Sequence, residues 1–151
     1  MSDAADGSGG EGAPEIARLR RNFIAERTFE HHLGFQVVEA RPGHAVLAID
    51  VQEFHLNGNG TLHGGVYASL IDNAMGLAVA ALAQVRIATT QMNVHFLAAV
   101  KEGQITCTGE VVHRTRRTAT AEAKVRDAAG NLVAMGTGAF RIFEQQGQPI
   151  V

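Results

Sequence analysis

One carboxylate inside a long apolar run constrains this chain more than any other feature. Residues 66–82 read VYASLIDNAMGLAVAAL, and Asp72 is the one charged side chain among them. A helix that is apolar on nearly every face belongs in a protein interior, where an ionised carboxylate costs several kcal/mol unless other groups compensate it. The sequence therefore predicts a buried central helix and makes Asp72 the first candidate for a chemical role.

Length and composition predict one soluble domain. The chain has 151 residues, of which 46% are hydrophobic, and its formal net charge is -2, which gives no general attraction for nucleic acid or anionic membranes. Residues 1–13 carry no Lys or Arg and no apolar run, unlike a secretory signal. The uncharged stretch after Asp72 ends at Arg86, short of the ~20 residues that a membrane-spanning helix needs. We expect a cytoplasmic protein without a nucleic-acid or membrane partner.

The N-terminal part predicts a tail followed by a flanking helix. Residues 1–13 are rich in Gly, Ala and Ser and cannot bury enough surface to offset their ordering entropy, so a disordered tail is expected there. Pro14 suits the first position of a helix, and apolar residues recur at helical spacing up to about His32. Gly34 is a plausible stop. A single domain is therefore expected over residues 14–151, with a flanking helix over about 14–32.

The rest of the chain alternates between strand signals and turns. Two short strands, 35–39 and 45–51, are joined by a turn sequence and predict a β-hairpin. Residues 56–61 form a loop rich in Gly and Asn, and the central helix is expected from about Gly64 to about Ala83. Four further strands are predicted at 87–98, 104–113, 119–127 and 132–143. Short connections favour an antiparallel meander, so we expect an α+β fold in which a sheet of about six strands curls around the helix.

The tripeptide His63-Gly64-Gly65 stands where a loop enters the central helix. The first backbone N–H groups of a helix have no intrahelical partner, so they are available to a developing oxyanion, unless these glycines only ease a tight turn. Asp72 lies eight residues beyond Gly64, or about 12 Å along a helix, too far to serve the same carbonyl. A two-fold partner would bring donor and carboxylate together. The structural alternative is a buried Asp72 satisfied by Ser69, Asn73 or backbone groups.

These residues carry a resemblance to a known family. The segment 55–65, HLNGNGTLHGG, followed by Asp72, resembles the hotdog-fold acyl-CoA thioesterases of the PaaI type. Asn57 precedes His63 by six residues, Asp72 follows it by nine, and Thr90 lies eighteen beyond Asp72, as in the family pattern. The resemblance extends over residues 35–143 and implies the hotdog fold, in which one long helix is wrapped by a curved antiparallel sheet.

The resemblance also implies an activity and roles for individual residues. It implies hydrolysis of an aromatic (phenylacetyl-type) or medium-chain acyl-CoA to the free acid and CoA, in a homodimer with a shared active site that pairs into a dimer of dimers. No metal and no cofactor are expected, and no His in the chain shows the spacing to Cys or carboxylates that zinc sites use. In this implied site, the Gly64 N–H donates to the oxyanion, Gly65 lies beside the substrate, and His63 supports the turn. Asp72 acts as general base or nucleophile. Asn57 orients the water or the thioester, and Thr90 positions the water or the Asp72 carboxylate.

A local cluster of arginines provides a candidate site for the phosphates of CoA. The segment 113–118 reads HRTRRT between two predicted strands. Arg116, Arg117 and Thr118 offer charge-assisted and neutral hydrogen bonds that suit phosphate groups. The alternative is an ordinary solvated hairpin, and strand alternation would send Arg116 and Arg117 to opposite faces.

Two other functions are compatible with the same fold. A hydratase or dehydratase acting on acyl thioesters would exchange protons through a His and an acid, but the combination of His63-Gly64-Gly65 with Asp72 argues against that local pattern. A non-catalytic acyl-CoA sensor would bind ligand without turnover. The residues before Phe35 are too few for a DNA-binding domain, and the carboxylate fits hydrolysis better than binding alone.

Overall fold

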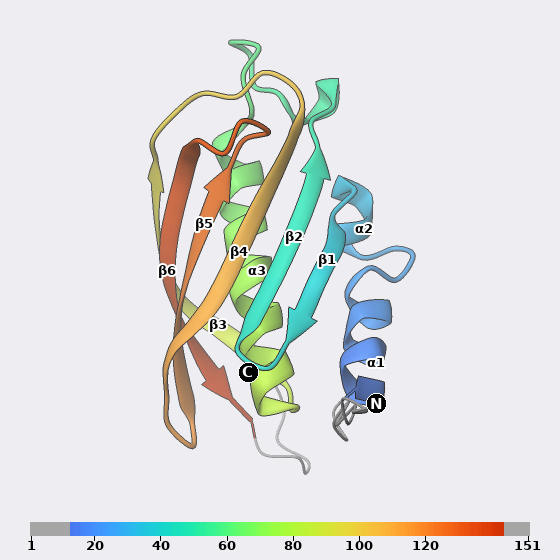
Figure 1. Ribbon diagram of the computed structural model, residues 1–151, viewed down its shortest axis with the longest axis vertical. Helices are drawn as coiled ribbons and strands as arrows, with labels where there is room; N and C mark the ends of the chain where they lie inside the picture. Colours follow the sequence, from blue (N-terminus) through green and yellow to red (C-terminus); the bar gives the residue numbers. More distant parts are fainter. Residues whose placement is uncertain (1–12, 144–151) are drawn as a thin grey trace, which may run out of the picture.

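A six-stranded antiparallel sheet wraps around one long helix in the computed structural model, which describes residues 13–143 (Figure 1). The helix α3 spans Gly64–Ala83, as the sequence predicts. The fold is therefore the expected α+β hotdog arrangement. The predicted disordered tail falls, except for Ala13, outside the described residues. The strands are β1 (Gln36–Arg41), β2 (His44–Asp50), β3 (Ile87–Phe96), β4 (Gln104–Arg114), β5 (Thr118–Arg126) and β6 (Leu132–Ile142).

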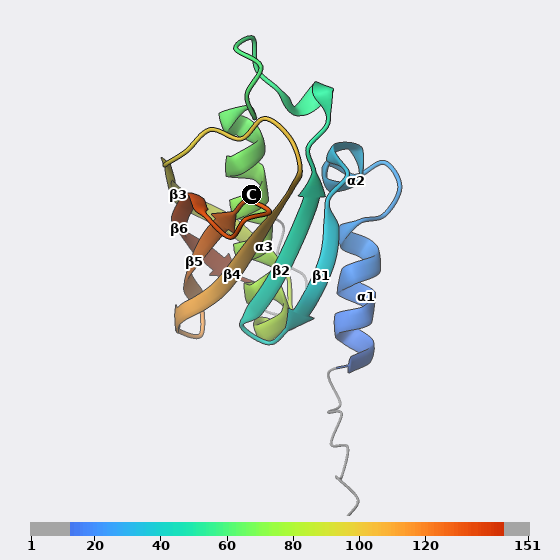
Figure 2. The same cartoon turned by 45° about the horizontal axis from the view of Figure 1, so that its top comes forward.

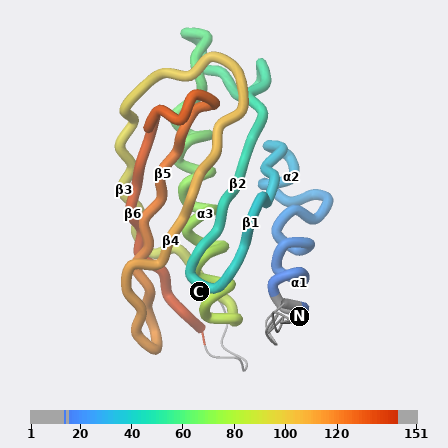
Figure 3. Tube along the Cα trace, viewed as in Figure 1, coloured from blue at the N-terminus to red at the C-terminus, as the bar shows by residue number. Residues whose placement is uncertain are grey.

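The strand order is β1-β2-β4-β5-β6-β3, with every neighbouring pair antiparallel. The predicted meander is thus correct for β4, β5 and β6 but wrong for β3, which follows α3 in sequence and pairs with β6 at the far edge. The helix carries the chain across the sheet between β2 and β3, and residues 97–103 return it to β4 beside β2 (Figure 3). The β3 strand therefore forms one edge of the sheet and β1 the other.

The helix lies unusually close to the sheet because glycines face it. A Cβ atom built on Gly109 of β4 would stand 2.5 Å from the carbonyl oxygen of Ala74, and one on Gly136 of β6 would stand 2.9 Å from Ile71 Cγ2. Only glycine leaves room for such an approach. The apolar residues of α3 are buried on the sheet, among them Leu70, Ile71, Ala74, Met75 and Ala78. α3 has the length and apolar composition of a membrane span, but here it is the core helix, as its burial shows.

The predicted flanking helix over 14–32 is two helices. α1 spans Ala13–Phe23 and α2 spans Phe29–Leu33. The chain breaks between them because Arg27 adopts a left-handed φ of 75° and Thr28 caps α2 by accepting a hydrogen bond from the His31 N–H. Gly34 ends α2 with φ 80°, as the sequence predicts. Both helices lie beside β1 (Figure 2), and α1 also contacts α3.

Candidate active site

Asp72 is only half-buried, although its helix supplies the core. One of its carboxylate oxygens, Oδ1, accepts a hydrogen bond of 2.8 Å from the Thr89 hydroxyl of β3. The expectation of a carboxylate enclosed in apolar surroundings is therefore wrong, because Asp72 faces a cavity. Neither structural partner considered from the sequence holds it: the Asn73 amide donates to the Ser69 carbonyl, and the Ser69 hydroxyl donates to the Gly65 carbonyl.

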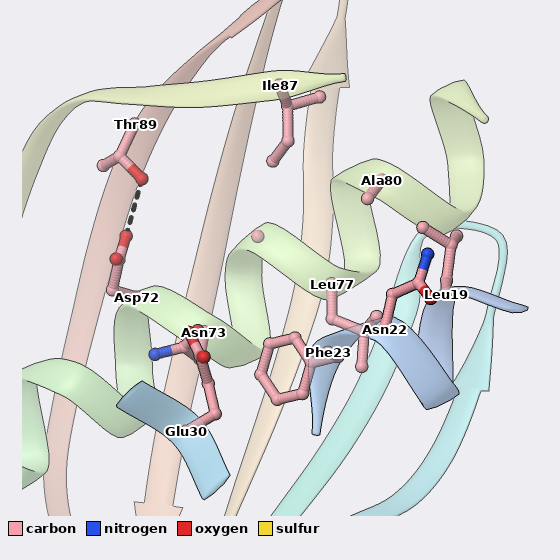
Figure 4. A pocket seen from close by; sticks show the side chains of 11 residues that line it. Leu19, Asn22, Phe23, Glu30, Asp72, Asn73, Leu77, Ala80, Ile87 and Thr89 are labelled. Atoms are coloured by element: carbon pink, nitrogen blue, oxygen red, sulfur yellow. Dashed lines mark hydrogen bonds between the residues drawn. The ribbon is translucent and has the colours of Figure 1, made fainter. Parts of the chain in front are cut away.

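The cavity beside Asp72 has a volume of about 410 Å³, within the range of small-molecule sites. Asp72 and Thr89 lie at one end of it, and Leu19 and Ala80 lie toward the other (Figure 4). Four elements, α1, α2, α3 and β3, form its walls. The site therefore joins a carboxylate to a largely apolar chamber. The remaining lining residues are Asn22, Phe23, Glu30, Asn73, Gly76, Leu77 and Ile87.

The turn that begins α3 holds one unused hydrogen-bond donor. His63 is the N-cap, and its Nδ1 accepts a 2.8 Å hydrogen bond from the Gly65 N–H. The N–H groups of Val66 and Tyr67 donate to the His63 carbonyl. Among the described residues 13–143, no group accepts a hydrogen bond from the Gly64 N–H. Of the two glycine donors considered from the sequence, Gly64 is therefore the available one, at the positive end of the helix dipole.

The loop before this turn is held by its own side chains. Asn57 Oδ1 accepts hydrogen bonds from the backbone N–H groups of Asn59 and Thr61, and its Nδ2 donates to the Thr61 hydroxyl oxygen. Asn57 thus shapes the loop in the single chain. His55 is 1% exposed and anchors the loop, because its Nε2 donates to the Leu33 carbonyl while its Nδ1 accepts from the Gln52 N–H. The His55 carbonyl accepts a hydrogen bond from the His63 N–H. His55 therefore connects α2, through Leu33, to the turn at His63.

Thr90 occupies a different position from Thr89. The pairing of β3 with β6 shifts register between Thr89 and Gln91, and the Thr90 hydroxyl donates to the Ala139 carbonyl at 3.1 Å. Within the chain, the contact with the Asp72 carboxylate is therefore made by Thr89, and the role expected of Thr90, positioning the water or the Asp72 carboxylate, stays a prediction. The β-bulge is the physical cause of the contact by Thr89, since an extra residue in one strand re-aims neighbouring side chains.

Thr90 lines a second cavity of about 520 Å³ over β3, β5 and β6. Arg117 and Arg141 both line it, with the side chains of Thr118 and Thr120 beside them. Arg141 also stacks over the Phe143 ring at 5.3 Å, and within residues 13–143 neither arginine has a carboxylate within 4 Å. The cavity is therefore a positively charged site without a counter-charge. Arg116 is exposed and does not line it.

The sequence identified Asp72 and the turn but missed two side chains of the site. Thr89 and Arg141 carried no motif signal, and each is identified only by its place in the sheet. The cavity wall from α1 and α2 was hinted at by the apolar spacing around Phe23. In the part of the chain that the structure describes, no three His, Cys, Asp or Glu side chains are grouped as a metal site would require.

The site places an available backbone donor, the Gly64 N–H, and a carboxylate, Asp72, on one helix beside a largely apolar chamber, a set of groups that suits acyl transfer or hydrolysis. Residues 59–134 match the sequence profile of the thioesterase superfamily. The chain is 35% identical over 116 residues to acyl-coenzyme A thioesterase 13 of Homo sapiens, an alignment that covers 73% of this chain and 81% of the relative. This chain belongs to the thioesterase superfamily and is a thioester hydrolase.

Solved structures agree with that assignment. A thioesterase superfamily member 2 of zebrafish has 28% identity and a TM-score of 0.76, with 85% of this chain and 96% of that chain covered. The phenylacetic acid degradation protein PaaI of Thermus thermophilus, as a mutant, has 30% identity and a TM-score of 0.72, with 76% and 98% covered. The PaaI protein of E. coli, at 20% identity and a TM-score of 0.80 over 87% of this chain and 95% of that one, supports the fold. The PaaI-type resemblance seen in the sequence is thus confirmed.

Proposed function

We propose that this protein is an acyl-CoA thioesterase that hydrolyses aromatic or medium-chain acyl-CoA to the free acid and CoA. The observation that carries the proposal is the pairing of an unused donor, the Gly64 N–H, with a cavity-facing carboxylate, Asp72, on the same helix. The sequence likeness to human acyl-coenzyme A thioesterase 13 supports CoA esters as substrates. The cavity of about 410 Å³ beside Asp72 supports an acyl group of medium size.

In the proposed reaction, Asp72 activates a water molecule that attacks the thioester carbonyl. The Asp72 carboxylate accepts the proton from this water as the C–O bond forms, and the Gly64 N–H stabilises the developing oxyanion. Collapse of the tetrahedral intermediate breaks the C–S bond, and the CoA thiolate takes up the proton. Direct attack by the Asp72 carboxylate, through an anhydride that water then opens, uses the same groups. Asn57 is proposed to orient the water or the thioester, and Thr90 to position the water or the Asp72 carboxylate.

The geometry of α3 supports a shared active site. Gly64 and Asp72 are eight residues apart on one straight helix, about 12 Å along its axis, so one thioester does not reach both within a single chain. We propose a homodimer in which Gly64 with its neighbours His63 and Gly65 from one subunit faces Asp72 of the other, with two dimers pairing into a tetramer. A two-fold axis would then create two equivalent sites.

The second cavity supports a contact with the phosphates of CoA. Arg117 and Thr118 were candidates from the sequence, and the cavity adds Arg141 to them. Guanidinium groups bind phosphates through paired, charge-assisted hydrogen bonds. We propose that Arg117, Arg141 and Thr118 bind CoA phosphates, with exposed Arg116 adding long-range attraction.

The test is thiol release from acyl-CoA esters by the full-length protein and by Asp72→Asn. We expect the native protein to release CoA from phenylacetyl-CoA or hexanoyl-CoA, and Asp72→Asn to lose activity by about 10²–10⁴-fold, the usual contribution of a general base. Asn73→Asp, next to it on α3, moves a charge without supplying the missing carboxylate and should not rescue Asp72→Asn. Circular dichroism and size-exclusion chromatography check that each variant is folded and assembled.

Each contrary result points to a different function. Bound acyl-CoA without thiol release would support the sensor. Loss or gain of water across the acyl chain, with the thioester intact, would support the hydratase or dehydratase. Release that is unchanged in Asp72→Asn would contradict the proposed role of Asp72 while retaining the thioesterase activity.

A further inference from the structure

The outer wall of the Asp72 cavity comes from two helices that precede the family match. Leu19 and Phe23 of α1 and Glu30 of α2 line the cavity opposite α3 (Figure 4). The match to the thioesterase superfamily covers residues 59–134, so α1 and α2 lie outside it. Asp72 thus lies within this match, and the wall facing it lies outside the match.

We infer that α1 and α2 form an acyl-selecting wall, Leu19, Phe23 and Glu30, that admits neutral acyl tails of limited length and rejects acyl tails that carry a second carboxylate. This inference rests on the proposed function, because it describes the acyl end of the same site. It adds two properties, a length limit and a charge filter, and assigns them to side chains outside the catalytic turn.

The direction of the acyl tail follows from the spacing of residues on α3. Asp72, Gly76 and Ala80 recur every four residues, so they lie on one face of the helix, and all three line the cavity. From Asp72 to Ala80 the helix rises about 12 Å. A thioester carbonyl placed at Asp72 would direct its tail along this face toward Leu19, which lies at the far end of the cavity (Figure 4). Leu19 therefore limits the length of the tail.

Gly76 forms the floor at the middle of this path. A Cβ atom on Gly76 would make ordinary contacts, 3.7 Å from the Phe140 ring and 3.8 Å from Ile87 Cδ1. Packing therefore permits alanine here, and alanine is the better helix former. The glycine leaves the cavity wider at its middle than the fold requires, which provides room for a ring or a branched tail beside Phe23.

The charge of the cavity provides the second filter. Among the residues that the structure describes, two carboxylates, Asp72 and Glu30, line it, and no Lys, Arg or His does. Within residues 13–143, no ion pair involves Glu30. A tail ending in a carboxylate would enter a site of the same charge in a partly desolvated space, where repulsion is stronger than in water. Neutral tails avoid this cost and gain contact with Leu19, Phe23 and Ile87.

The test compares matched substrates on the full-length protein. Hexanoyl-CoA and adipoyl-CoA have the same number of carbons and differ in the terminal carboxylate, and decanoyl-CoA probes length. For the native protein we expect kcat/KM for adipoyl-CoA to be about tenfold or more below that for hexanoyl-CoA. Glu30→Gln should raise the ratio of adipoyl-CoA to hexanoyl-CoA. Glu26→Gln, an exposed carboxylate next to α2 that does not line the cavity, should leave this ratio unchanged.

Length and width are tested by substitutions at opposite ends of the path. Leu19→Ala should raise kcat/KM for decanoyl-CoA relative to hexanoyl-CoA by about fourfold for each methylene that the enlarged cavity accommodates. Gly76→Ala should remain folded and lower kcat/KM for phenylacetyl-CoA relative to hexanoyl-CoA. Arg21→Ala, exposed on α1 and not part of the cavity, serves as the control and should change neither ratio.

The outcomes separate this inference from the proposed function. If the selectivity ratios are the same in the native protein, Leu19→Ala and Glu30→Gln, and hydrolysis still depends on Asp72, only the inference of an acyl-selecting wall is contradicted. If the native protein hydrolyses none of the CoA esters, both the proposed function and the inference of an acyl-selecting wall are contradicted. An equal loss of activity toward all substrates in Leu19→Ala would mean that α1 acts only as packing and would also overturn the wall.

Discussion

The Thr89 hydroxyl donates a 2.8 Å hydrogen bond to the carboxylate of Asp72, joining the edge strand β3 to the central helix α3 at one end of a cavity. This bond fixes one oxygen of the carboxylate and leaves the other free to act on water. It also explains how a carboxylate is retained on an otherwise apolar helix, since a half-buried charge with a hydrogen-bond partner avoids most of the cost of desolvation.

Thr89→Val should therefore lower kcat, because the Asp72 carboxylate loses the hydrogen bond that orients it. A hydrogen bond to a charged group contributes about 1.5–3 kcal/mol, so we expect a loss of about 10- to 100-fold. Thr89→Ser should restore most of the activity. Thr137→Val, at an exposed threonine of β6, is the matched control, and an equal effect there would contradict the assignment.

Sequence alone was sufficient for the parts of the fold that depend on local patterns. The bounds of α3 followed from the apolar run and the His63-Gly64-Gly65 turn, and the range of β5 (Thr118–Arg126) lies within about one residue of the predicted strand 119–127. The position of β3 at the sheet edge depends on pairing with β6, which is distant in sequence, and no local signal specifies it.

The site follows the same division. Asp72 and the helix turn were identified from residue type and spacing. Thr89 rather than Thr90 contacts Asp72 within the chain because a β-bulge shifts the pairing of β3 with β6 by one residue. The spacing of residues in the sequence does not encode this shift. The left-handed Arg27 that separates α1 from α2, and so sets the wall of the cavity, is a non-glycine residue in a conformation that sequence rules do not anticipate.

His63→Ala should weaken the start of α3 and the oxyanion turn together. The substitution removes the Nδ1 acceptor of the Gly65 N–H, and loss of an N-cap typically costs about 0.5–2 kcal/mol. We expect a lower midpoint in urea and a lower kcat. His63→Asn keeps a capping acceptor and should recover the stability. A stability loss that His63→Asn fails to recover would contradict the capping role.

Gly109→Ala should be among the most destabilising single changes in the chain. Its Cβ would stand 2.5 Å from backbone atoms of Ala74, so α3 and β4 would have to separate, and overpacking of this kind costs about 1–3 kcal/mol. Gly58→Ala is the control, because a Cβ there meets nothing within 4 Å. Urea denaturation of the two variants checks the difference, and equal midpoints would contradict the close approach of α3 to the sheet.

Cys107 should not react with thiol reagents in the folded protein. It is fully buried, and burial raises the pKa of its thiol, so the reactive thiolate is not formed at neutral or moderately alkaline pH. The native protein should therefore give no background in a colour assay of CoA release, and one equivalent of thiol should appear in denaturant. Rapid labelling of the native protein would show that β4 opens away from α3.

The double substitution Arg117→Ala with Arg141→Ala should weaken binding of CoA esters without a matching effect on short thioesters. Two guanidinium groups line the second cavity without a carboxylate partner in residues 13–143, so a phosphate there would supply the missing counter-charge. A charge-assisted hydrogen bond contributes about 1.5–3 kcal/mol, so KM for hexanoyl-CoA should rise by about tenfold or more. The KM for hexanoyl-N-acetylcysteamine, which has the same acyl group and no phosphate, should change little.

Salt and a control arginine separate a phosphate contact from general electrostatic attraction. KM of the native protein for hexanoyl-CoA should rise with ionic strength, and this dependence should be weaker in the double variant because two positive charges are gone. Arg114→Ala removes an exposed positive charge of β4 that does not line the cavity, and should have a much smaller effect on KM. If both thioesters respond equally to the double substitution, or if Arg114→Ala has the same effect, the two arginines do not bind the phosphates of CoA.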